Sequence, residues 1–430
     1  MIKILRERSD FIKNSFKLVA GTAIAQAISF LISPVITRLY TPADFGIFTF
    51  IISVVGGFGL IATLRYEMAI VLPREEKHAV NLVFISLGIA FLLCLGIAAG
   101  VFIFNAWFHK PGMIDPAYKS WLYVIPVMVL LVAAGNVFQN WFNRQKEYKT
   151  LALAKVLTSA GNNLVTLGLG FMGIGVWGLL AGNFSGLLMF NLLFVLVIIR
   201  RYHGHFGHYD RSGHKALALQ YKDLPLANTP QMLIELVQLY GIVFLLQAFF
   251  SSEVLGWYSL SQRLLQAPMW LIGTSLCQVY YKEASERFAA EGNITGLLGK
   301  TIKMSVMVAF PVLVVMLTAG PWLIGFIFGS AWRESGEIAR ILAPWFFFDF
   351  IRYSISQTPL IIGKARQMFF VSMIGAAFMI IAVSLGGFVL KNYTSSFILL
   401  SSLLSCYSIG VIWWILSSVK KASHVQSVSK

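Results

Sequence analysis

The sequence predicts an all-α polytopic membrane protein with about twelve transmembrane helices in two six-helix lobes. Three observations support this prediction: the composition, the spacing of the apolar segments, and the positions of the basic residues. Hydrophobic residues make up 57% of the 430 residues, charged residues make up only 12%, and the mean hydropathy is +0.75. This composition leaves no stretch for a soluble domain of ordinary size.

Twelve apolar windows are each long enough to form a membrane-spanning helix, which needs about 20 residues. They lie at approximately 16–37, 46–64, 82–104, 121–141, 151–172, 177–199, 226–249, 256–280, 301–320, 341–362, 368–390 and 396–417. The basic segment before the first window is followed by no convincing cleavage site, so we expect this span to be retained. An even number of spans places both termini on the same side of the membrane.

The basic residues are distributed unevenly between alternate loops. The net charge is +16, which in a soluble protein would suggest a nucleic-acid partner. With the N-terminus inside, 26 of the 34 Lys and Arg residues fall on the cytoplasmic side and six outside, while Arg263 and Arg352 lie within spans. This bias follows the positive-inside rule. It predicts cytoplasmic N- and C-termini and no nucleic-acid partner.

The longest polar interruption divides the chain into two halves. We expect an N-terminal six-helix lobe at 1–199, a cytoplasmic inter-lobe linker at 200–225 and a C-terminal six-helix lobe at 226–430. Since six is even, both lobes enter the membrane from the same side, which indicates parallel repeats related by a pseudo-twofold axis along the membrane normal. Substrate would then bind at the seam between the lobes.

A short hairpin sequence recurs in the two halves. Residues 39–48 and residues 249–258 align at a constant offset that matches Gly46 with Gly256. In each copy a hydroxyl residue can cap the new helix and an acid lies in its positive first turn. These are Thr41 and Asp44 in the first copy, where Pro42 fits the first helical position, and Ser251 and Glu253 in the second. The recurrence favours two homologous halves.

Four charged residues lie deep within the predicted spans: Glu235, Arg263, Asp349 and Arg352. A charge at the centre of a membrane helix costs about 2.5–3.5 kcal/mol, so such residues persist mainly where they pair or line a wet cavity. Asp349 and Arg352 are three residues apart on one helix, so they form either a structural ion pair or a functional site. Glu235 and Arg263 have no partner nearby in the sequence. We expect Glu235 to be a buried carboxyl with a raised pKa that can carry a proton, and Asp349 and Arg352 to be the other candidates for ion or proton coupling.

Polar residues also collect at the ends of two spans. Arg65 and Glu67 close the second span, where they form either an interfacial snorkelling pair or part of a site. An amide strip closes the fourth span, where Asn136, Gln139, Asn140 and Asn143 share one helix face. The strip either holds neighbouring helices together through polar contacts or forms a surface that faces a sugar.

Motifs for nucleotides and metals are weak. Glycine patterns at 168–173 and 173–178 match a dinucleotide-binding motif, but they lie between two spans, where close helix packing explains them better. Residues 296–301 imitate a phosphate-binding loop without its first glycine, so we expect no ATPase. The linker histidines, His203, His205, His208 and His214, are interpreted as solvated residues rather than zinc ligands. We expect no cofactor and no metal, and coupling to a proton or another ion is left open.

Taken as a set, five segments resemble the Wzx-type oligosaccharide flippases, the polysaccharide-synthesis family of the MOP superfamily. They lie at 34–50, 64–73, 141–149, 254–286 and 339–357, so the resemblance extends over nearly the whole chain. It implies a MOP/MATE-like fold with a V-shaped central cavity lined mainly by the first, second, seventh and eighth helices. It also implies a transporter rather than an enzyme, located in the bacterial inner membrane.

The resemblance also implies a cargo and its contacts. The cargo would be a polyprenyl-diphosphate-linked oligosaccharide of O-antigen, capsule or a related glycan, moved to the periplasmic leaflet by alternating access, with other polysaccharide-assembly membrane proteins as candidate partners. Arg65 and Arg263 match the family's cationic cavity, and guanidinium groups suit a diphosphate. We add Glu67 and Asn140 as candidate substrate contacts. The acids Glu235 and Asp349 depart from a uniformly cationic cavity.

Three alternatives stay open. A multidrug exporter of the same superfamily would use a cation-coupled carboxylate, for which Glu235 is the candidate. A polysaccharide polymerase or glycosyltransferase would need outer loops with paired acids or His, but the outer segments at 105–120 and 321–340 offer only Asp115, Glu334 and Glu337. A lipid II flippase typically carries two further helices.

Overall fold

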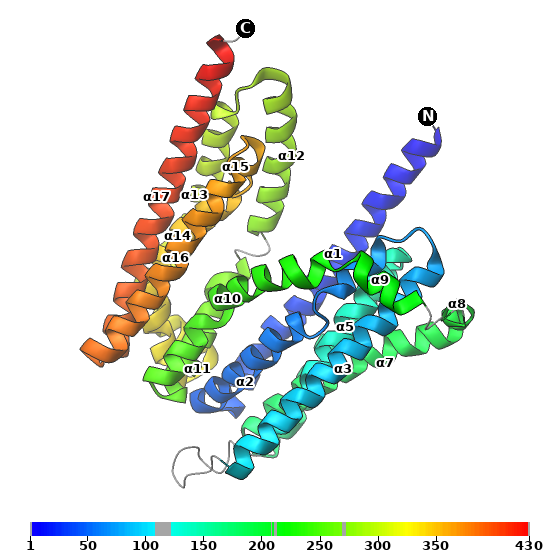
Figure 1. Ribbon diagram of the computed structural model, residues 1–430. Helices are drawn as coiled ribbons and strands as arrows, with labels where there is room; N and C mark the ends of the chain where they lie inside the picture. The colour runs from blue at the N-terminus through cyan, green and yellow to red at the C-terminus, as the bar shows by residue number, and fades with distance from the viewer. Residues whose placement is uncertain (1, 108–121, 208, 210–212, 269–271, 429–430) are drawn as a thin grey trace. The chain divides into compact units, whose positions relative to one another are not determined.

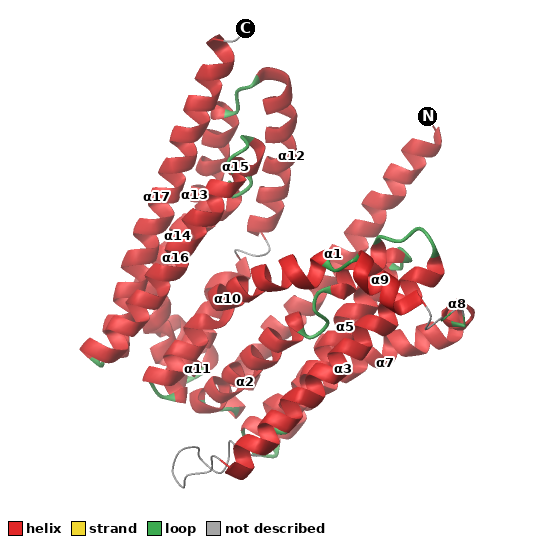
Figure 2. Cartoon of the chain, in the orientation of Figure 1, coloured by secondary structure: helices red, strands yellow, loops and turns green. Residues whose placement is uncertain are grey.

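The computed structural model describes residues 2–107, 122–207, 209, 213–268 and 272–428. These residues form helices joined by turns and short loops, with no strand among them (Figure 2). Asp115 and His208 lie outside the described residues. The chain divides into two compact units: unit 1 comprises Met1–Tyr40 and Phe48–Tyr240, and unit 2 comprises Thr41–Ile47 and Gly241–Lys430.

Unit 1 contains the first helices of the chain (Figure 1). Their bounds are α1 Ile2–Leu39, α2 Pro42–Ile61, η1 Tyr66–Val71, α3 Glu76–Trp107, α5 Ile125–Arg144, α6 Tyr148–Phe171, α7 Val176–Val197, η2 Ile198–Tyr202, α8 His203–Phe206, α9 His214–Gln220, η4 Leu224–Asn228 and α10 Thr229–Phe249. The first turn of α2 and the last turns of α10 belong to unit 2. Both helices therefore run from one unit into the other.

Unit 2 contains the remaining helices. Their bounds are α11 Ser252–Pro268, α12 Thr274–Glu291, α13 Thr295–Phe328, η6 Ser330–Trp332, α14 Arg333–Ser354, α15 Thr358–Ile361, α16 Ala365–Leu385, η7 Gly386–Leu390 and α17 Tyr393–Val428. Every predicted window contains a helix, and the eighth window contains parts of both α11 and α12. By length and apolar composition, eight of the described helices can cross a membrane, or nine if Leu224–Val237 and Leu239–Phe249, bent by 45°, form one span.

The same helix pairings recur in the two units. In unit 1, α3 packs against α5, α5 against α7, and α6 against α7. In unit 2, α13 packs against α14, α14 against α17, and α16 against α17 (Figure 1). These pairings correspond when α10 is matched with α1, so that α3, α5, α6 and α7 match α13, α14, α16 and α17, as two homologous halves require.

The two helices that follow the matched hairpins begin with the predicted caps. The amide and hydroxyl of Thr41 donate to Asp44 Oδ2 at 2.9 and 2.7 Å, and the Asp44 amide donates back to Thr41 Oγ1 at 3.2 Å. At the start of α11 the Val254 amide donates to Ser251 Oγ at 3.5 Å. Both caps satisfy backbone donors that a helix N-terminus would otherwise leave unpaired.

Part of the predicted linker packs against unit 1. Tyr202, Phe206 and Tyr221 pack against the buried core of unit 1, and the division into units falls later, inside α10. The Phe206 ring lies 5.0 Å from the ring of Trp141. The aromatic residues placed among the histidines explain this docking, because each buries a large apolar ring.

Candidate functional site

The turn between α2 and η1 holds Arg65 in a strained backbone. Leu64 has φ +48° and Arg65 has φ +65°, so two consecutive residues other than glycine adopt the left-handed region. Such residues cost of order 1–3 kcal/mol each and persist where the surroundings fix them. Here the Leu64 amide donates to the Ile61 carbonyl at 2.8 Å, and Thr63 is fully buried. The fold therefore fixes the position of the arginine.

Glu67 anchors the arginine. This residue is only 3% exposed, its Oε2 accepts a hydrogen bond from the Thr63 hydroxyl, and its Oε1 lies 3.5 Å from Arg65 Nη1. A buried carboxylate is stable only where it is paired and hydrogen-bonded, and this one is both. The carboxylate is thus buried in unit 1 while Arg65 is partly exposed, and Glu67 serves as the partner of Arg65.

The Arg65 guanidinium keeps donors for a further partner. The side chain is 20% exposed, and its buried Nε has no hydrogen-bond partner among the described residues. A guanidinium offers five N–H donors in a planar fork, which matches phosphate oxygens in a bidentate manner. The contact with Glu67 Oε1 leaves other N–H donors of Arg65 for a second partner. The arrangement can bind a phosphate or a carboxylate.

Arg144 and Tyr66 stabilise the segment that follows the turn. Arg144 Nη1 donates to the carbonyls of Ile70 at 3.3 Å and Pro73 at 2.6 Å. The Tyr66 hydroxyl donates to the carbonyl of Ala218 in α9 at 2.9 Å, and burial raises the pKa of this phenol, so it stays a donor. Sequence reasoning did not single out Arg144 as a site residue. Its signal was its place in the 141–149 segment.

Asn140 lies on α5, which packs beside η1. Its Nδ2 donates to the Asn136 carbonyl of its own helix at 3.0 Å, and the whole amide strip is half-buried. Val137 and Trp141 of α5 share a buried core with Tyr66. The structure therefore places Asn140 on an element adjacent to the arginine turn.

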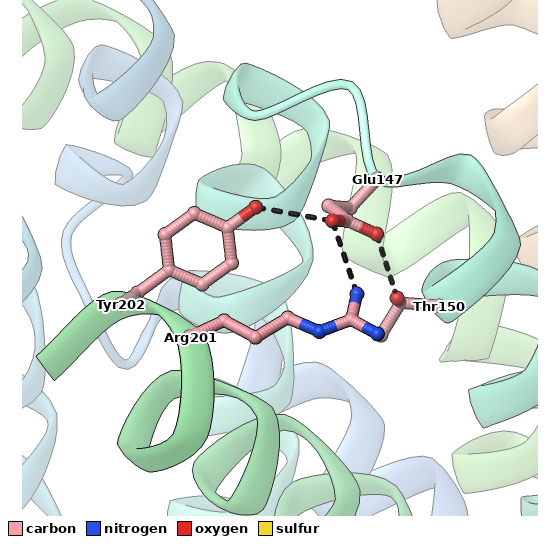
Figure 3. Close-up of polar contacts among 4 residues, drawn as sticks. All are labelled: Glu147, Thr150, Arg201 and Tyr202. Carbon is pink, nitrogen blue, oxygen red and sulfur yellow. Dashed lines mark hydrogen bonds and ion pairs between the residues drawn. The ribbon is translucent and has the colours of Figure 1, made fainter.

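A second polar group joins η2, which follows α7, to the start of α6 (Figure 3). Glu147 Oε1 accepts from the Tyr202 hydroxyl at 3.1 Å and lies 3.5 Å from Arg201 Nη1, and Glu147 Oε2 accepts from Thr150 Oγ1 at 2.9 Å. One turn further along the linker, His205 Nε2 lies 3.5 Å from a carboxylate oxygen of Glu76. Within the described ranges, no three His, Cys, Asp or Glu side chains gather as metal ligands.

Glu235 differs from its prediction. It lies on α10 with an exposed side chain, and its Oε1 accepts from Gln231 Nε2 at 3.2 Å. This face of α10 is not covered within its unit, which differs from the buried position expected for Glu235. Its role in coupling stays a prediction.

Unit 2 holds the remaining predicted residues. Arg352 donates to Asp349 Oδ1 from Nε at 2.8 Å and from Nη2 at 2.6 Å, and its guanidinium lies 5.8 Å from the ring centre of Tyr407. These contacts favour the structural ion pair. Arg263 lies on α11 with an exposed side chain. Sequence reasoning missed Tyr407 as the aromatic partner from α17.

Comparison with known proteins gives a family and two curated relatives. The family described as polysaccharide biosynthesis protein matches residues 35–337. The teichuronic acid biosynthesis protein TuaB of Bacillus subtilis (strain 168) is 23% identical over 267 residues, which are 59% of this chain and 52% of the relative. The succinoglycan biosynthesis transport protein ExoT of Rhizobium meliloti (strain 1021) is 22% identical over 324 residues, which are 74% of this chain and 62% of the relative. The chain thus spans less than two thirds of the length of either relative.

Solved structures show the fold. The lipid II flippase MurJ in its inward closed conformation aligns with a TM-score of 0.69 at 14% identity, covering 93% of this chain and 87% of that one. An outward-facing multidrug resistance MATE transporter of the MOP superfamily aligns with a TM-score of 0.62 at 14% identity, covering 95% and 96%. The predicted fold class of a two-lobed helical membrane protein is therefore confirmed. The family match confirms the predicted relation to polysaccharide synthesis.

Proposed function

Because the chain belongs to the polysaccharide biosynthesis protein family, we propose that this multi-pass membrane protein is a flippase. Its cargo is a polyprenyl-diphosphate-linked oligosaccharide, which it moves from the cytoplasmic to the periplasmic leaflet of the bacterial inner membrane by alternating access. Both termini lie in the cytoplasm. The names of two similar proteins, a succinoglycan biosynthesis transport protein and a lipid II flippase, support transport rather than catalysis.

The observation that supports this cargo best is the Arg65 turn. A strained backbone and a buried carboxylate fix a guanidinium that still has donors for an anion. Backbone strain lowers stability and collects at functional sites, so its presence here supports a role for Arg65 in binding an anionic substrate. A permanent charge with planar donors suits a diphosphate better than a sugar hydroxyl. Arg263 is the second cation that we assign to the diphosphate.

The cargo needs such a protein for a physical reason. A hydrated glycan and its diphosphate cannot cross a hydrocarbon layer about 30 Å thick unaided. We assign the coupling of transport to an ion or proton to Glu235, since the carboxylate of Asp349 is already neutralised by Arg352. Asn140 is assigned to the sugar, because an amide can both donate to and accept from hydroxyl groups.

The test is the side of the membrane on which lipid-linked oligosaccharide accumulates in cells that lack the gene. A reagent confined to the periplasm reports the exposed oligosaccharide, and surface glycan is measured in parallel. We expect accumulation inside and loss of surface glycan. Oligosaccharide that reaches the periplasm unpolymerised would favour a polymerase, and unchanged glycan with raised drug sensitivity would favour an exporter.

Variants then test the site. The double variant Arg65→Gln/Glu67→Gln removes the charge without leaving a buried carboxylate unpaired, and Arg74→Gln removes an exposed arginine nearby as the control. We expect the double variant to lose surface glycan and the control to keep it at equal protein levels. Normal glycan from both would refute the assignment of Arg65.

A further inference from the structure

Helices α1 and α6 of unit 1 pack along a polar seam. Ser159 Oγ donates to the Ala25 carbonyl at 2.7 Å and lies 3.0 Å from Ser29 Oγ. Asn163 Nδ2 lies 3.0 Å from the same Ser29 hydroxyl and 2.7 Å from the Ser159 carbonyl. These groups therefore satisfy one another, as polar residues between membrane helices do.

Lys155 lies in the same seam and differs from its other members. It stands seven residues after the start of α6, which is about 10 Å along the helix, and it is half-buried. Its Nζ donates to Thr22 Oγ1 of α1 at 3.1 Å. An ammonium group has three donors, so one hydroxyl leaves most of its capacity and its full charge uncompensated.

Several arginines of the protein have carboxylate partners. Arg65 pairs with Glu67, Arg201 with Glu147, and Arg352 with Asp349. For Lys155 no carboxylate partner occurs among the residues that the structure describes. A lysine could extend to the membrane surface to reach water, but the contact with Thr22 holds this ammonium in the seam. A half-buried ammonium without a counter-charge is costly, which indicates a functional partner of opposite charge.

We propose that Lys155 binds a lipid-borne phosphate group, which is the diphosphate of the lipid-linked substrate. This inference rests on the proposed function and adds a cation to it. A lysine ammonium is a compact charge that binds phosphate without the fixed geometry of arginine. Lys155 thus complements the guanidinium of Arg65, which lies in the same unit.

The test uses purified full-length protein in lipid nanodiscs, with farnesyl diphosphate as the probe and farnesol as the uncharged comparison. The variants are Lys155→Gln, which removes the charge, and Lys155→Arg, which keeps it. The matched control is Lys149→Gln, because Lys149 is exposed in the first turn of the same helix. Folding of each variant is checked by its elution profile and its melting temperature.

We expect Lys155→Gln to weaken farnesyl diphosphate binding about tenfold or more, since a hydrogen bond to a charged group is lost. Lys155→Arg should bind within a few-fold of wild type, Lys149→Gln should bind as wild type does, and farnesol binding should not change. Equal diphosphate binding by Lys155→Gln and Lys149→Gln would overturn the proposal while leaving the proposed function intact. No diphosphate binding by wild type would count against the proposed cargo itself.

A parallel set of nanodiscs separates the substrate from ordinary membrane lipid. Retention of phosphatidylglycerol by the protein is measured for wild type and Lys155→Gln. The proposal expects no difference between them. A loss of phosphatidylglycerol together with unchanged diphosphate binding would assign Lys155 to a bilayer phospholipid and overturn the substrate assignment.

Discussion

Gly46 of α2 and Gly256 of α11 occupy equivalent places in a reciprocal helix crossing inside unit 2. A Cβ on Gly46 would collide with the carbonyl oxygen of Ser252 and would lie 3.1 Å from the Gly256 amide nitrogen. A Cβ on Gly256 would collide with the carbonyl oxygen of Pro42. The offset that matches the two glycines in the sequence also matches Pro42 with Ser252. Gly46 of α2 therefore contacts the first residue of α11, and Gly256 of α11 contacts the first residue of α2. A local twofold axis requires this reciprocity.

Replacing either glycine with alanine should destabilise the protein. The added methyl meets backbone atoms, which cannot rotate away, so the two helix starts must separate, at a cost of about 1–3 kcal/mol. The measurement is the melting temperature of Gly46→Ala and Gly256→Ala in detergent. Gly88→Ala on α3 is the control, because a Cβ there meets no atom within 4 Å. Equal melting temperatures for the three variants would contradict the crossing.

Removing the charge of Glu67 should destabilise the protein more than removing the whole ion pair. Glu67→Gln leaves the largely buried Arg65 without its carboxylate, at a cost of about 2 kcal/mol after allowance for its partial exposure. The double variant Arg65→Met/Glu67→Gln leaves no unpaired charge and should recover part of the loss. Thermal unfolding of wild type, Arg65→Met, Glu67→Gln and the double variant gives the coupling energy between the two side chains. A coupling energy near zero would show that the two side chains act independently.

Lys146→Gly should raise the stability of unit 1. Lys146 adopts φ +57° with an exposed side chain in the turn between α5 and α6. Glycine relieves the left-handed strain without loss of packing, although it also gives the unfolded chain more freedom, so the net gain is about 0.5–1 kcal/mol. The control is Lys149→Gly, in which glycine enters a helix and should lower stability by a similar amount. Melting temperatures that move in the same direction would contradict this account.

Tyr202→Phe should loosen the linker. The variant keeps the ring near Phe142 but removes the hydroxyl that donates to Glu147. We expect faster amide hydrogen exchange across 198–206, by a factor of about five, since a hydrogen bond to a charged group is worth more than about 1 kcal/mol. Tyr209→Phe, an exposed position further along the linker, is the comparison. Exchange that is equally slow in both variants would mean that the apolar contacts alone dock the segment.

The sequence predicted the features that depend on local pattern. Each of the twelve apolar windows contains a helix among the described residues, because a span must be long and apolar wherever it packs. The matched hairpins predicted the caps of α2 and the equivalence of Gly46 and Gly256, because capping chemistry is set by a few adjacent residues. Neither pattern could show that the two glycines face each other across a helix crossing.

The site depended on contacts between distant segments, which the sequence alone could not supply. Arg65 and Glu67 were singled out from the sequence, but the burial of Glu67 depends on the cover that α5 and α9 provide. Lys155 was counted among the 26 basic residues on the cytoplasmic side, because it lies only four residues after the start of its window at 151. Glu235 was expected to be buried from its depth in an apolar window, yet depth along a helix does not say which face is covered.

The docking of Tyr202, Phe206 and Tyr221 on unit 1 decides where the molecule can be cut. A fragment of the first half that ends at residue 199 would lack Tyr202, Phe206 and Tyr221, and would present the bare core of unit 1 to the solvent. Halves expressed as separate polypeptides should therefore keep residues 200–225 with the first fragment. A protease site or a fluorescent protein inserted into it would interrupt part of the fold, so the segment is a poor choice for a tag.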